Sequence, residues 1–496
     1  MSRAKTSPDD RSITSGSDFL QLNIGDAPAG GRSDWLAAQL RLAISDGRLP
    51  VGSRLPATRV LAGELRVSRG VVTEAYQRLN EDGHVAGRRR GGTIVVAAPA
   101  AAPGAVPPPA PAGPPPTGAV FITAPGPDVF DSLRSAPARI DLSPGVPDLA
   151  AFPRAAWLRA ERSVLGGLSP SDLGYGDPRG TAALRLAVAN WLARNRGIRV
   201  DPGEVLVVAG VAQALGLLAQ VLRHDGISQV AVEDPGSLGA RQHLRNWQLD
   251  TPPIPVDSEG VRVDELRAQG APAVLLTPAH QFPTGVVLGG ERRRELMRWA
   301  DDGGLIVEDD YDAEHRYDRP AVPALRSMLA DRVCYAGSVS KLLAPALRVG
   351  WMLAPAKYHD ALVAAKRYAD LGNAVLPQLV LAELMGSGEM ERQLRFLRRR
   401  HRRRRDAMID AIRTHLPGAV VHGAAAGLHL MITFAAGFAD VDLAAASLAR
   451  GVKTQPLSWH RQRPDQPGLV LGYAASAPAD IAEGVATIGD VLRGLS

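Results

Sequence analysis

The first clear pattern along the chain is an apolar repeat with the 3.6-residue period of an α-helix, which begins near Asp34 and ends near Gly47. A second helical pattern starts at Thr58, which we expect to cap that helix. A third runs from Arg69 to Asp82. Two short helices joined by a tight turn predict a helix-turn-helix. The apolar positions with this period are Trp35, Leu36, Leu40, Ile44, Leu61, Leu65, Val71, Val72, Tyr76 and Leu79.

Shorter apolar runs follow this unit. His84–Gly87 and Gly91–Val96 predict the two strands of a β-hairpin whose tip carries Arg88–Arg90. A hairpin placed after a helix-turn-helix forms a wing. Residues 97–118 are rich in Ala, Pro and Gly, a composition that forms no packed core and predicts an extended linker.

From residue 119 to residue 496, helical patterns alternate with short apolar runs that are typical of buried strands. This alternation predicts an α/β fold with an open, largely parallel sheet. Such sheets bind ligands at the carboxyl ends of their strands, so polar residues that follow an apolar run are candidates for a site. The predicted strands are 205–208, 230–232, 273–276, 305–307 and 333–335.

Composition agrees with a soluble protein of several domains. The chain has 496 residues, of which 45% are hydrophobic and 22% charged, and this length suggests two or three domains. The single cysteine, Cys334, excludes an intramolecular disulfide and fits a reducing compartment. No apolar run approaches the ~20 residues of a membrane span, and residues 1–17 lack a signal-peptide core. We therefore expect a cytoplasmic protein.

Positive charge is concentrated in the predicted helix-turn-helix unit. Between Asp34 and Val96 there are ten arginines and six acidic residues, and 10 − 6 = +4 is most of the chain's net charge of +6. Arginines at this density pair with phosphates and guanine edges, so double-stranded DNA is the expected partner. The alternative is a three-helix protein-interaction module, which the triple arginine at the hairpin tip disfavours.

One lysine is unusual in a chain whose positive charge is mainly arginine. Lys341 follows the last predicted strand and lies among the small residues Gly337, Ser338 and Ser340. A partly desolvated lysine loses its proton near neutral pH and can form a Schiff base. Nearby hydroxyls and Arg348 suit a phosphate. Pyridoxal phosphate requires both features, although a surface lysine before a helix would show the same local pattern.

Other segments with candidate chemistry also follow predicted strands. Gly210–Leu215 opens a helix. The free amides at the start of this helix would bind a phosphate, or the segment would serve only to pack the helix against the sheet. Thr277–Gly285 contains His280, and a lone histidine is more often structural than catalytic. Glu308–Asp312 offers an acid for a pyridine nitrogen and a tyrosine for a phenolic oxygen. A Mg²⁺ site is the alternative there, but no phosphate-loop motif accompanies it, and no metal is expected.

Residues 33–96 resemble the GntR-type winged helix-turn-helix. The matching segments are Gly47–Pro50, Gly52–Pro56, Leu61–Ala62, Val67–Arg69, Val72, Ala75–Tyr76, Leu79 and Gly83. The resemblance implies that DNA is contacted by Arg59, Arg69 and the wing residues Arg88, Arg89 and Arg90.

The strand-end segments, taken in order, resemble fold-type I aminotransferases over nearly all of residues 119–496. A winged helix, a linker and such a domain in one chain are similar to the MocR/GabR family of bacterial transcription regulators. The resemblance implies the fold of pyridoxal-phosphate-dependent transferases, with a large sheet domain and a smaller C-terminal α/β domain, and a head-to-tail homodimer. The expected parts are an arm at 1–32, the winged helix at 33–96, the linker at 97–118 and the aminotransferase-like domain at 119–496.

The same resemblance assigns roles to individual residues. Lys341 would form the Schiff base with the cofactor aldehyde, Asp309 would meet the pyridine nitrogen and Tyr311 the phenolic oxygen. Tyr175, in the segment before a predicted helix, would reach the cofactor phosphate of the partner subunit. The residues expected to hold the chain's own cofactor phosphate are Ser338, Arg348, Gly210, Val211 and Ala212.

Three positions depart from the aminotransferase pattern. Phe282 stands where aminotransferases commonly have Asn, and the regulators resemble this chain at that position. Ser237 stands where an aromatic side chain usually stacks on the cofactor ring. Ser237 therefore predicts a lower cofactor affinity. The arginine that binds a substrate carboxylate in aminotransferases has no counterpart in Gly468–Gly472, which leaves Arg461 and Arg463 as candidates. Its loss predicts slow turnover, because the substrate lacks its orienting ion pair.

These features favour a regulator that binds an operator as a dimer and senses an amino compound, or pyridoxal phosphate itself, at the Lys341 site. An amino compound would displace Lys341 and shift a conformational equilibrium. The alternative is an active aminotransferase with a DNA-binding appendage; in the regulator we expect at most a slow half-reaction. The arginine run Arg398–Arg405, in the predicted helix 392–406, is either a solvated face or a second DNA contact, and we favour the solvated face.

Overall fold

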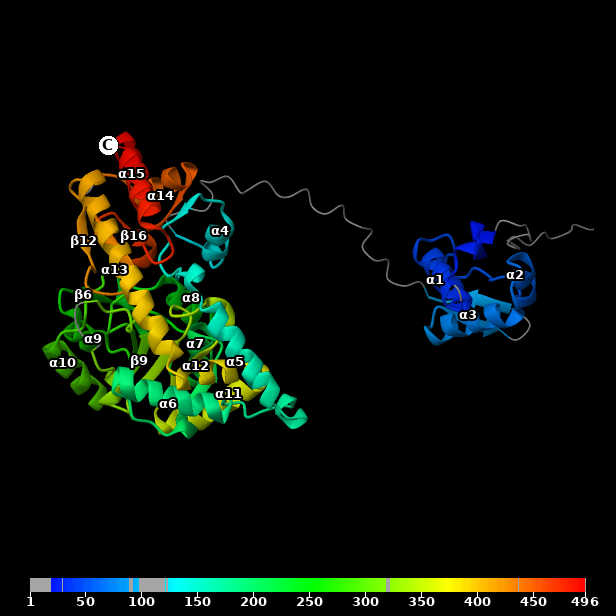
Figure 1. Ribbon diagram of the computed structural model, residues 1–496, viewed down its shortest axis with the longest axis horizontal. Helices are drawn as coiled ribbons and strands as arrows, with labels where there is room; N and C mark the ends of the chain where they lie inside the picture. The colour runs from blue at the N-terminus through cyan, green and yellow to red at the C-terminus, as the bar shows by residue number, and fades with distance from the viewer. Residues whose placement is uncertain are drawn as a thin grey trace, which may run out of the picture. The chain divides into compact units, whose positions relative to one another are not determined.

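The computed structural model describes residues 19–28, 30–88, 92–97, 121, 124–317, 322–435 and 437–495. The chain divides into two compact units, Met1–Gly113 and Pro114–Ser496 (Figure 1). The predicted linker, apart from Ala97, and residues 1–18 of the predicted arm lie outside the described residues. The four-part division of the chain therefore stays a prediction.

The first unit is built from three helices and a two-stranded hairpin. They are α1 (Arg32–Ser45), α2 (Thr58–Glu64), α3 (Arg69–Glu81), β1 (Val85–Arg88) and β2 (Gly92–Val95). Leu40, Leu61 and Leu79 are fully buried in a core that the three helices share. The predicted helices and the antiparallel hairpin are confirmed. Thr58, which we expected to cap α2, is instead its first residue, and Ala57 occupies the cap position without a side-chain bond.

An eight-stranded sheet forms the centre of the second unit, in the order β4-β11-β10-β9-β8-β5-β6-β7. Only β11 and β7 run antiparallel to the other strands of this sheet. The predicted open, largely parallel α/β sheet is thus confirmed. The strands are β4 (Leu206–Val208), β5 (Ala231–Asp234), β6 (Pro253–Asp257), β7 (Gly260–Val261), β8 (Ala273–Leu276), β9 (Leu305–Asp310), β10 (Val333–Ser338) and β11 (Gly350–Leu353).

Apolar side chains cover both faces of this sheet, which explains its continuous apolar strands. Val207 and Tyr335 belong to a core shared with α5, α6 and α12 on one face, whereas Val208 and Cys334 pack with α7 and α11 on the other. None of the helices formed by the described residues is long and apolar enough to cross a membrane. The helices are α5 (Arg154–Gly167), α6 (Ala182–Arg196), α7 (Val211–His224), α8 (Leu238–Asn246), α9 (Val263–Gln269), α10 (Gly290–Asp301), α11 (Ala356–Asp370), α12 (Val375–Gly386) and α13 (Glu389–His415).

A smaller lobe contains a four-stranded antiparallel sheet in the order β12-β13-β16-β15. Figure 1 shows α13 running alongside the large sheet and into this lobe. We call this part the C-terminal lobe and the remainder of the second unit the sheet lobe. The elements of the C-terminal lobe are β12 (Val420–His422), β13 (His429–Thr433), α14 (Asp440–Ala449), β14 (Val452–Lys453), β15 (Gln455–Pro456), η9 (Leu457–His460), β16 (Gly468–Gly472) and α15 (Pro478–Leu495). α4 (Val129–Ser135) and β3 (Ile140–Asp141) pack against them.

The arginine run of α13 is not simply a solvated face. Arg400 Nε and Arg404 Nη1 each donate to Oδ2 of the buried Asp148 at 2.7 Å. These ion pairs fasten the helix to the rest of the second unit, so the solvated-face interpretation is wrong for this part of the run. Arg399 and Arg403 on the same helix are exposed, and for them the solvated face stays a prediction.

Candidate functional site

Lys341 lies just beyond the end of β10, partly buried at the carboxyl edge of the large sheet. Its amine Nζ donates a hydrogen bond to the carbonyl of Gly145 at 2.5 Å. Desolvation lowers the pKa of Lys341, and the carboxylates of Asp312 and Asp309 oppose that shift. The sheet edge thus carries an amine that loses its proton more readily than a solvated lysine does.

Asp309 lies on β9, the strand beside β10. Its Oδ1 atom is buried without a hydrogen-bond partner. Desolvation raises the pKa of Asp309 to about 7, and the neighbouring charge of Asp310 adds to the shift. A buried oxygen without a partner costs free energy, so this position is suited to receive a hydrogen-bond donor or a cation.

Tyr311 is oriented by His280, which the sequence pattern placed in a strand-end segment without assigning it a role. His280 Nδ1 lies 3.0 Å from the Tyr311 hydroxyl and 3.0 Å from Oδ2 of Asp312. The Tyr311 hydroxyl also donates to the carbonyl of His280 at 3.2 Å. Only the fold brings the Thr277–Gly285 segment against Tyr311, so the role of His280 could not be read from its neighbours in the chain.

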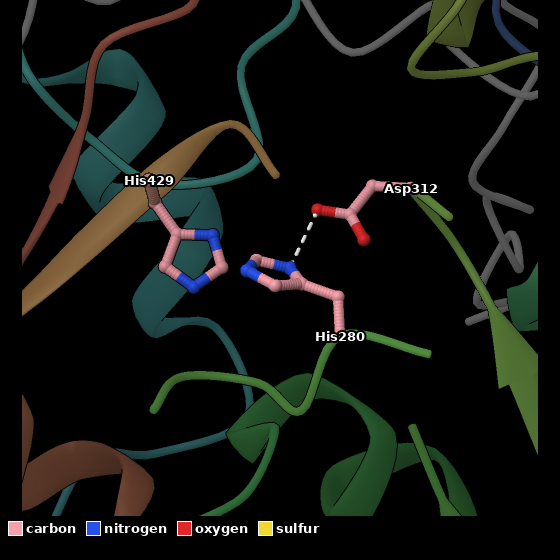
Figure 2. A group of neighbouring side chains, drawn as sticks. All are labelled: His280, Asp312 and His429. Atoms are coloured by element: carbon pink, nitrogen blue, oxygen red, sulfur yellow. Dashed lines mark hydrogen bonds and ion pairs between the residues drawn. The ribbon is translucent and has the colours of Figure 1, made fainter. Parts of the chain in front are cut away.

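His280, Asp312 and His429 form a compact group, in which the second nitrogen of His280 faces His429 (Figure 2). Possible ligand atoms of the three side chains lie within 4.8 Å of one another. His429 Nε2, however, is bonded to the carbonyl of Pro283 at 3.2 Å, and His280 Nδ1 is bonded to Asp312. These bonds indicate that the three side chains form a hydrogen-bonded group that orients Tyr311, rather than a metal centre.

A cradle for an anion lies at the start of α7. Gly210 precedes this helix with a φ of 83°, and no side chain caps the amides of Val211 and Ala212. Arg348, at a left-handed φ of 50°, donates from Nη2 to the carbonyl of Ala209. A Cβ at Gly210 would lie 3.4 Å from Nη1 of Arg348. Glycine therefore lets a guanidinium approach a helix N-terminus, and both groups bind phosphate.

Ser338, the last residue of β10, reaches the same cradle. A Cβ on Gly350 would come within 3.0 Å of Cα of Gly210 and 3.1 Å of Cβ of Ser338. The three residues are therefore in close contact, on strands β10 and β11 and at the end of β4. The structure brings Ser338, Gly210 and Arg348 together, as the sequence predicts.

Lys366, inside α11, supports this cradle and was missed by sequence reasoning. Its fully buried amine donates to three oxygens, which include Gln213 Oε1 at 2.9 Å and Asn373 Oδ1 at 2.5 Å. Asn373 Nδ2 donates to the carbonyl of Arg348 at 3.0 Å, and Gln213 accepts the amide of Ala209 at 2.7 Å. Lys366 thus fixes both sides of the cradle without facing it.

Ser237 begins α8, where its Oγ accepts the amide of Ala240 at 3.2 Å. A narrow cavity of about 20 Å³ lies beside it and is also lined by Asp309 and Thr277. No aromatic side chain lines this cavity. The serine therefore leaves space next to Asp309, where an aromatic ring was expected from the aminotransferase pattern.

The predicted DNA contacts of the first unit are only partly described. Arg59 on α2 and Arg69 on α3 are exposed and form no ion pair with any described residue. Arg48, by contrast, is paired with Asp46 at 2.7 Å. Arg69 Nε donates to Oγ1 of Thr58 at 3.3 Å, and the guanidinium groups of Arg59 and Arg69 are both exposed. The wing side chains of Arg88, Arg89 and Arg90 lie outside the described residues.

Tyr175 is 95% exposed, on the segment that precedes α6. Its side chain is accessible to another molecule.

Two family models match the chain in succession. Bacterial regulatory proteins of the gntR family match residues 33–95, and aminotransferase class I and II matches residues 138–460. The chain is also 32% identical over 459 residues to the probable rhizopine catabolism regulatory protein MocR of Rhizobium meliloti, with 91% of each chain covered. The chain belongs to the MocR/GabR family of transcription regulators. A second relative of this MocR/GabR protein is the pyridoxine biosynthesis regulator PdxR of Corynebacterium glutamicum, 30% identical over 89% of this chain and 91% of the relative.

Solved aminotransferases share the fold of the second unit of this MocR/GabR protein. LysN, an α-aminoadipate aminotransferase of Thermus thermophilus solved with N-(5'-phosphopyridoxyl)-L-leucine, is 29% identical and matches 76% of this chain and 97% of its own, with a TM-score of 0.68. A kynurenine aminotransferase of Pyrococcus horikoshii, solved with PMP, is 25% identical and matches 74% and 93%, with the same TM-score of 0.68. The expected fold class is confirmed.

Proposed function

We propose that this MocR/GabR protein binds pyridoxal phosphate at Lys341 and uses the loaded site to sense an amino compound. The proposal rests on the Lys341 amine, with its lowered pKa, beside the unpartnered Oδ1 of Asp309 on the neighbouring strand. An amine and an unpaired acid at one sheet edge suit the aldehyde and the pyridine nitrogen of this cofactor. When bound, the cofactor supplies an aldehyde that condenses reversibly with amines.

The cradle at α7 fits the phosphate of the cofactor. Arg348 and the uncapped amides of Val211 and Ala212 are donors of the kind that bind phosphate oxygens. Gly210 keeps the approach open, and the hydroxyl of Ser338 adds a further donor beside it.

Two polar side chains fit the ring of the cofactor. Asp309 would hold the pyridine nitrogen protonated, since that proton gives its unpartnered oxygen a donor. Tyr311, oriented by His280, would donate to the phenolic oxygen. Both side chains thus complement polar atoms of the group that Lys341 would hold.

The first unit would bind double-stranded operator DNA through Arg59, Arg69 and the wing. The exposed guanidinium groups of Arg59 and Arg69 support this role, because neither forms an ion pair with a described residue and their charge is available to neutralise phosphates. A head-to-tail homodimer would present two such units to two half-sites. The exposure of Tyr175 supports a contact with the partner subunit's phosphate cradle.

Sensing requires that the ligand prefers one conformation of the dimer over another. An amino compound that takes the place of Lys341 would remove the hydrogen bond from this lysine to Gly145. We therefore place the effector at the Lys341 site.

Two other functions, an active aminotransferase and a sensor of pyridoxal phosphate itself, require different features of the site. An active aminotransferase needs a cation for the substrate carboxylate, and β16, which is fully described, carries no arginine. A sensor of pyridoxal phosphate itself needs only modest cofactor affinity, which the cavity beside Ser237 favours. Release of a ketoacid over many turnovers would indicate the first function. A change of DNA affinity with cofactor alone, and none with any amine, would indicate the second.

The proposed function is tested on the full-length protein, with an operator obtained by selection from random DNA. Pyridoxal phosphate should produce a visible absorbance band that Lys341→Ala abolishes. Lys357→Ala should retain the band, because Lys357 is an exposed lysine paired with Asp225. Operator affinity is then measured with and without amino compounds. A band that persists in Lys341→Ala, or an operator affinity that no amine changes, would contradict the proposal.

A further inference from the structure

A cleft of about 700 Å³ lies between the sheet lobe and the C-terminal lobe. This volume is within the range of about 300–1,000 Å³ that ligand pockets occupy. Arg461 and Arg463, the two arginines that remained as candidates from the sequence, both line it, whereas Lys341 and Asp309 are not among its described lining residues. We call this space the lobe cleft.

Arg461 is a cation whose hydrogen bonds are incomplete. Its side chain is 11% exposed, and its Nε atom is buried without a hydrogen-bond partner among the described residues. Its hydrogen bond to the carbonyl of Gln466, at 3.0 Å, and its ion pair with Asp465, at 3.1 Å, both involve Nη1. Nε and Nη2 form one edge of the guanidinium group, and a carboxylate binds such an edge through two parallel hydrogen bonds.

Two carboxylates that line the lobe cleft are bonded to groups other than Arg461. Asp234 accepts the backbone amides of Gln462 and Arg463 at 2.8 and 3.2 Å. Asp257 is paired with Arg292 at 3.0 Å. The two amides on Asp234 belong to the segment that follows Arg461, so these bonds also hold the two lobes together at the rim of the cleft.

Asp465 is the carboxylate that contacts Arg461, and its hold on the arginine is weak. Its side chain is 64% exposed, and exposed ion pairs contribute little free energy. Its charge also repels any anion that approaches the guanidinium. A ligand carboxylate therefore competes with Asp465 for Arg461, and loss of this charge should favour the ligand.

Apolar side chains line the lobe cleft on both sides. Pro235 and Val286 belong to the sheet lobe, and Met431 belongs to the C-terminal lobe. An alkyl or aryl group placed between them would be removed from water. The imidazole of His422, also in the lining, is neutral at neutral pH, because burial and the charge of Arg461 lower its pKa.

We propose that the lobe cleft binds a small carboxylic acid with an alkyl or aryl body, whose carboxylate pairs with the Nε–Nη2 edge of Arg461. The ligand needs no amino group, because Lys341 does not line the cleft. It contacts both lobes at once, so its binding favours the arrangement in which the lobes meet. The proposal goes beyond amine sensing at Lys341 and does not depend on it.

The proposal is tested by calorimetry on the full-length, cofactor-loaded protein at one pH. The acids are butanoate, 4-methylpentanoate and 3-phenylpropanoate, which have no amine to react with the cofactor aldehyde. Each is compared with its own amide, which keeps the size of the acid without its charge, and inorganic phosphate is the test of an anion without an apolar body. We expect at least one acid to bind about tenfold or more tightly than its amide and than phosphate. Its affinity should be the same in the cofactor-free protein.

Two substitutions should change the affinity in opposite directions. Arg461→Gln should weaken binding of the acid by at least about tenfold and leave the amide unaffected. Asp465→Asn should strengthen binding of the acid by about threefold, because a competing charge is removed. Asp490→Asn, at another exposed position paired with an arginine, is the control and should bind as wild type does.

Four results would overturn the proposal and leave amine sensing intact. They are acids that bind no better than their amides, phosphate that binds as tightly as the acids, an affinity that Arg461→Gln does not change, and an affinity that requires the cofactor. The last result would place the acid at the Lys341 site. Where Arg461→Gln does not fold, the wild-type comparison and the exposed Asp465→Asn variant decide the matter.

Discussion

Asp309 is the residue through which the cofactor-free protein should respond most directly to pH. Its pKa, ordinarily 3.8, is raised to about 7, first by desolvation and then by the charge of Asp310. Burial likewise raises the pKa of Glu233 and of Glu308 to about 7. Between about pH 4 and pH 7 these three carboxyl groups therefore hold more protons in the folded protein than in the unfolded chain. By that sign, the contribution of these three groups to stability falls as the pH rises through this window.

Asp309→Asn should reduce this loss of stability, because the amide has no proton to release. We expect the free energy of unfolding of the cofactor-free protein to fall less between pH 5 and pH 8 in the variant, by on the order of 1–3 kcal/mol. Denaturant unfolding at the two pH values measures the difference. Asp302→Asn, at an exposed position, is the control. An unchanged pH dependence in Asp309→Asn would show that this carboxyl ionises normally.

At the scale of elements, α7 and α11 are joined by the buried amine of Lys366 behind the phosphate cradle. Lys366→Met should weaken binding of pyridoxal phosphate by about tenfold, because Arg348 and Ala209 lose the bonds that fix them. Equilibrium titration of cofactor absorbance measures the change. Lys357→Met, on the same helix but exposed, should bind as wild type does. Equal affinity in both variants would show that the cradle holds its shape without Lys366.

The helix-turn-helix makes its own prediction at this scale. Arg69→Ala and Arg59→Ala should each weaken operator binding by about three- to tenfold and lower the salt dependence by about one ion. Arg48→Ala should change little, since Arg48 is already paired with Asp46. Gel-shift titrations at several salt concentrations give both quantities, and the cofactor absorbance should be the same in all variants. Loss of binding in Arg48→Ala alone would place the DNA on another face.

Local patterns in the sequence predicted the helices and strands, whereas no such pattern predicted the contacts between these elements. Lys341 and the acidic run Glu308–Asp312 could be located because an apolar run ends shortly before each of them, whereas the choice of Asp309 within that run came from the family resemblance. The same reasoning could not find the carbonyl that Lys341 contacts, since Gly145 is 196 residues away in sequence. Lys366 and Gln213 are 153 residues apart. Such pairs arise from the packing of whole helices and lobes, so a single sequence carries no periodic pattern that reveals them.

At the scale of the whole molecule, the family resemblance, which places Tyr175 at the partner subunit's cofactor phosphate, predicts that the cofactor site is complete only in a dimer, and the exposure of Tyr175 allows this. Cofactor affinity should then rise with protein concentration across the range where subunits associate. Tyr175→Phe should weaken cofactor binding without changing the oligomeric state. Tyr368→Phe is the matched control, because Tyr368 is 87% exposed. Sedimentation and cofactor titration on the same samples separate the two effects. Unchanged affinity in Tyr175→Phe would remove this residue from the partner's site.

The bond between the Lys341 amine and the Gly145 carbonyl has a consequence for how occupancy of the site is transmitted. Gly145 follows Leu142 in the chain, and the carbonyl of Leu142 accepts a hydrogen bond from the amide of Gly472, at the end of β16, at 2.7 Å. If Lys341 binds the cofactor as proposed, the Gly145 carbonyl would lose this donor, while the same backbone segment would stay bonded to the C-terminal lobe. A change at the lysine would then reach that lobe through the main chain, without prior rotation of a helix.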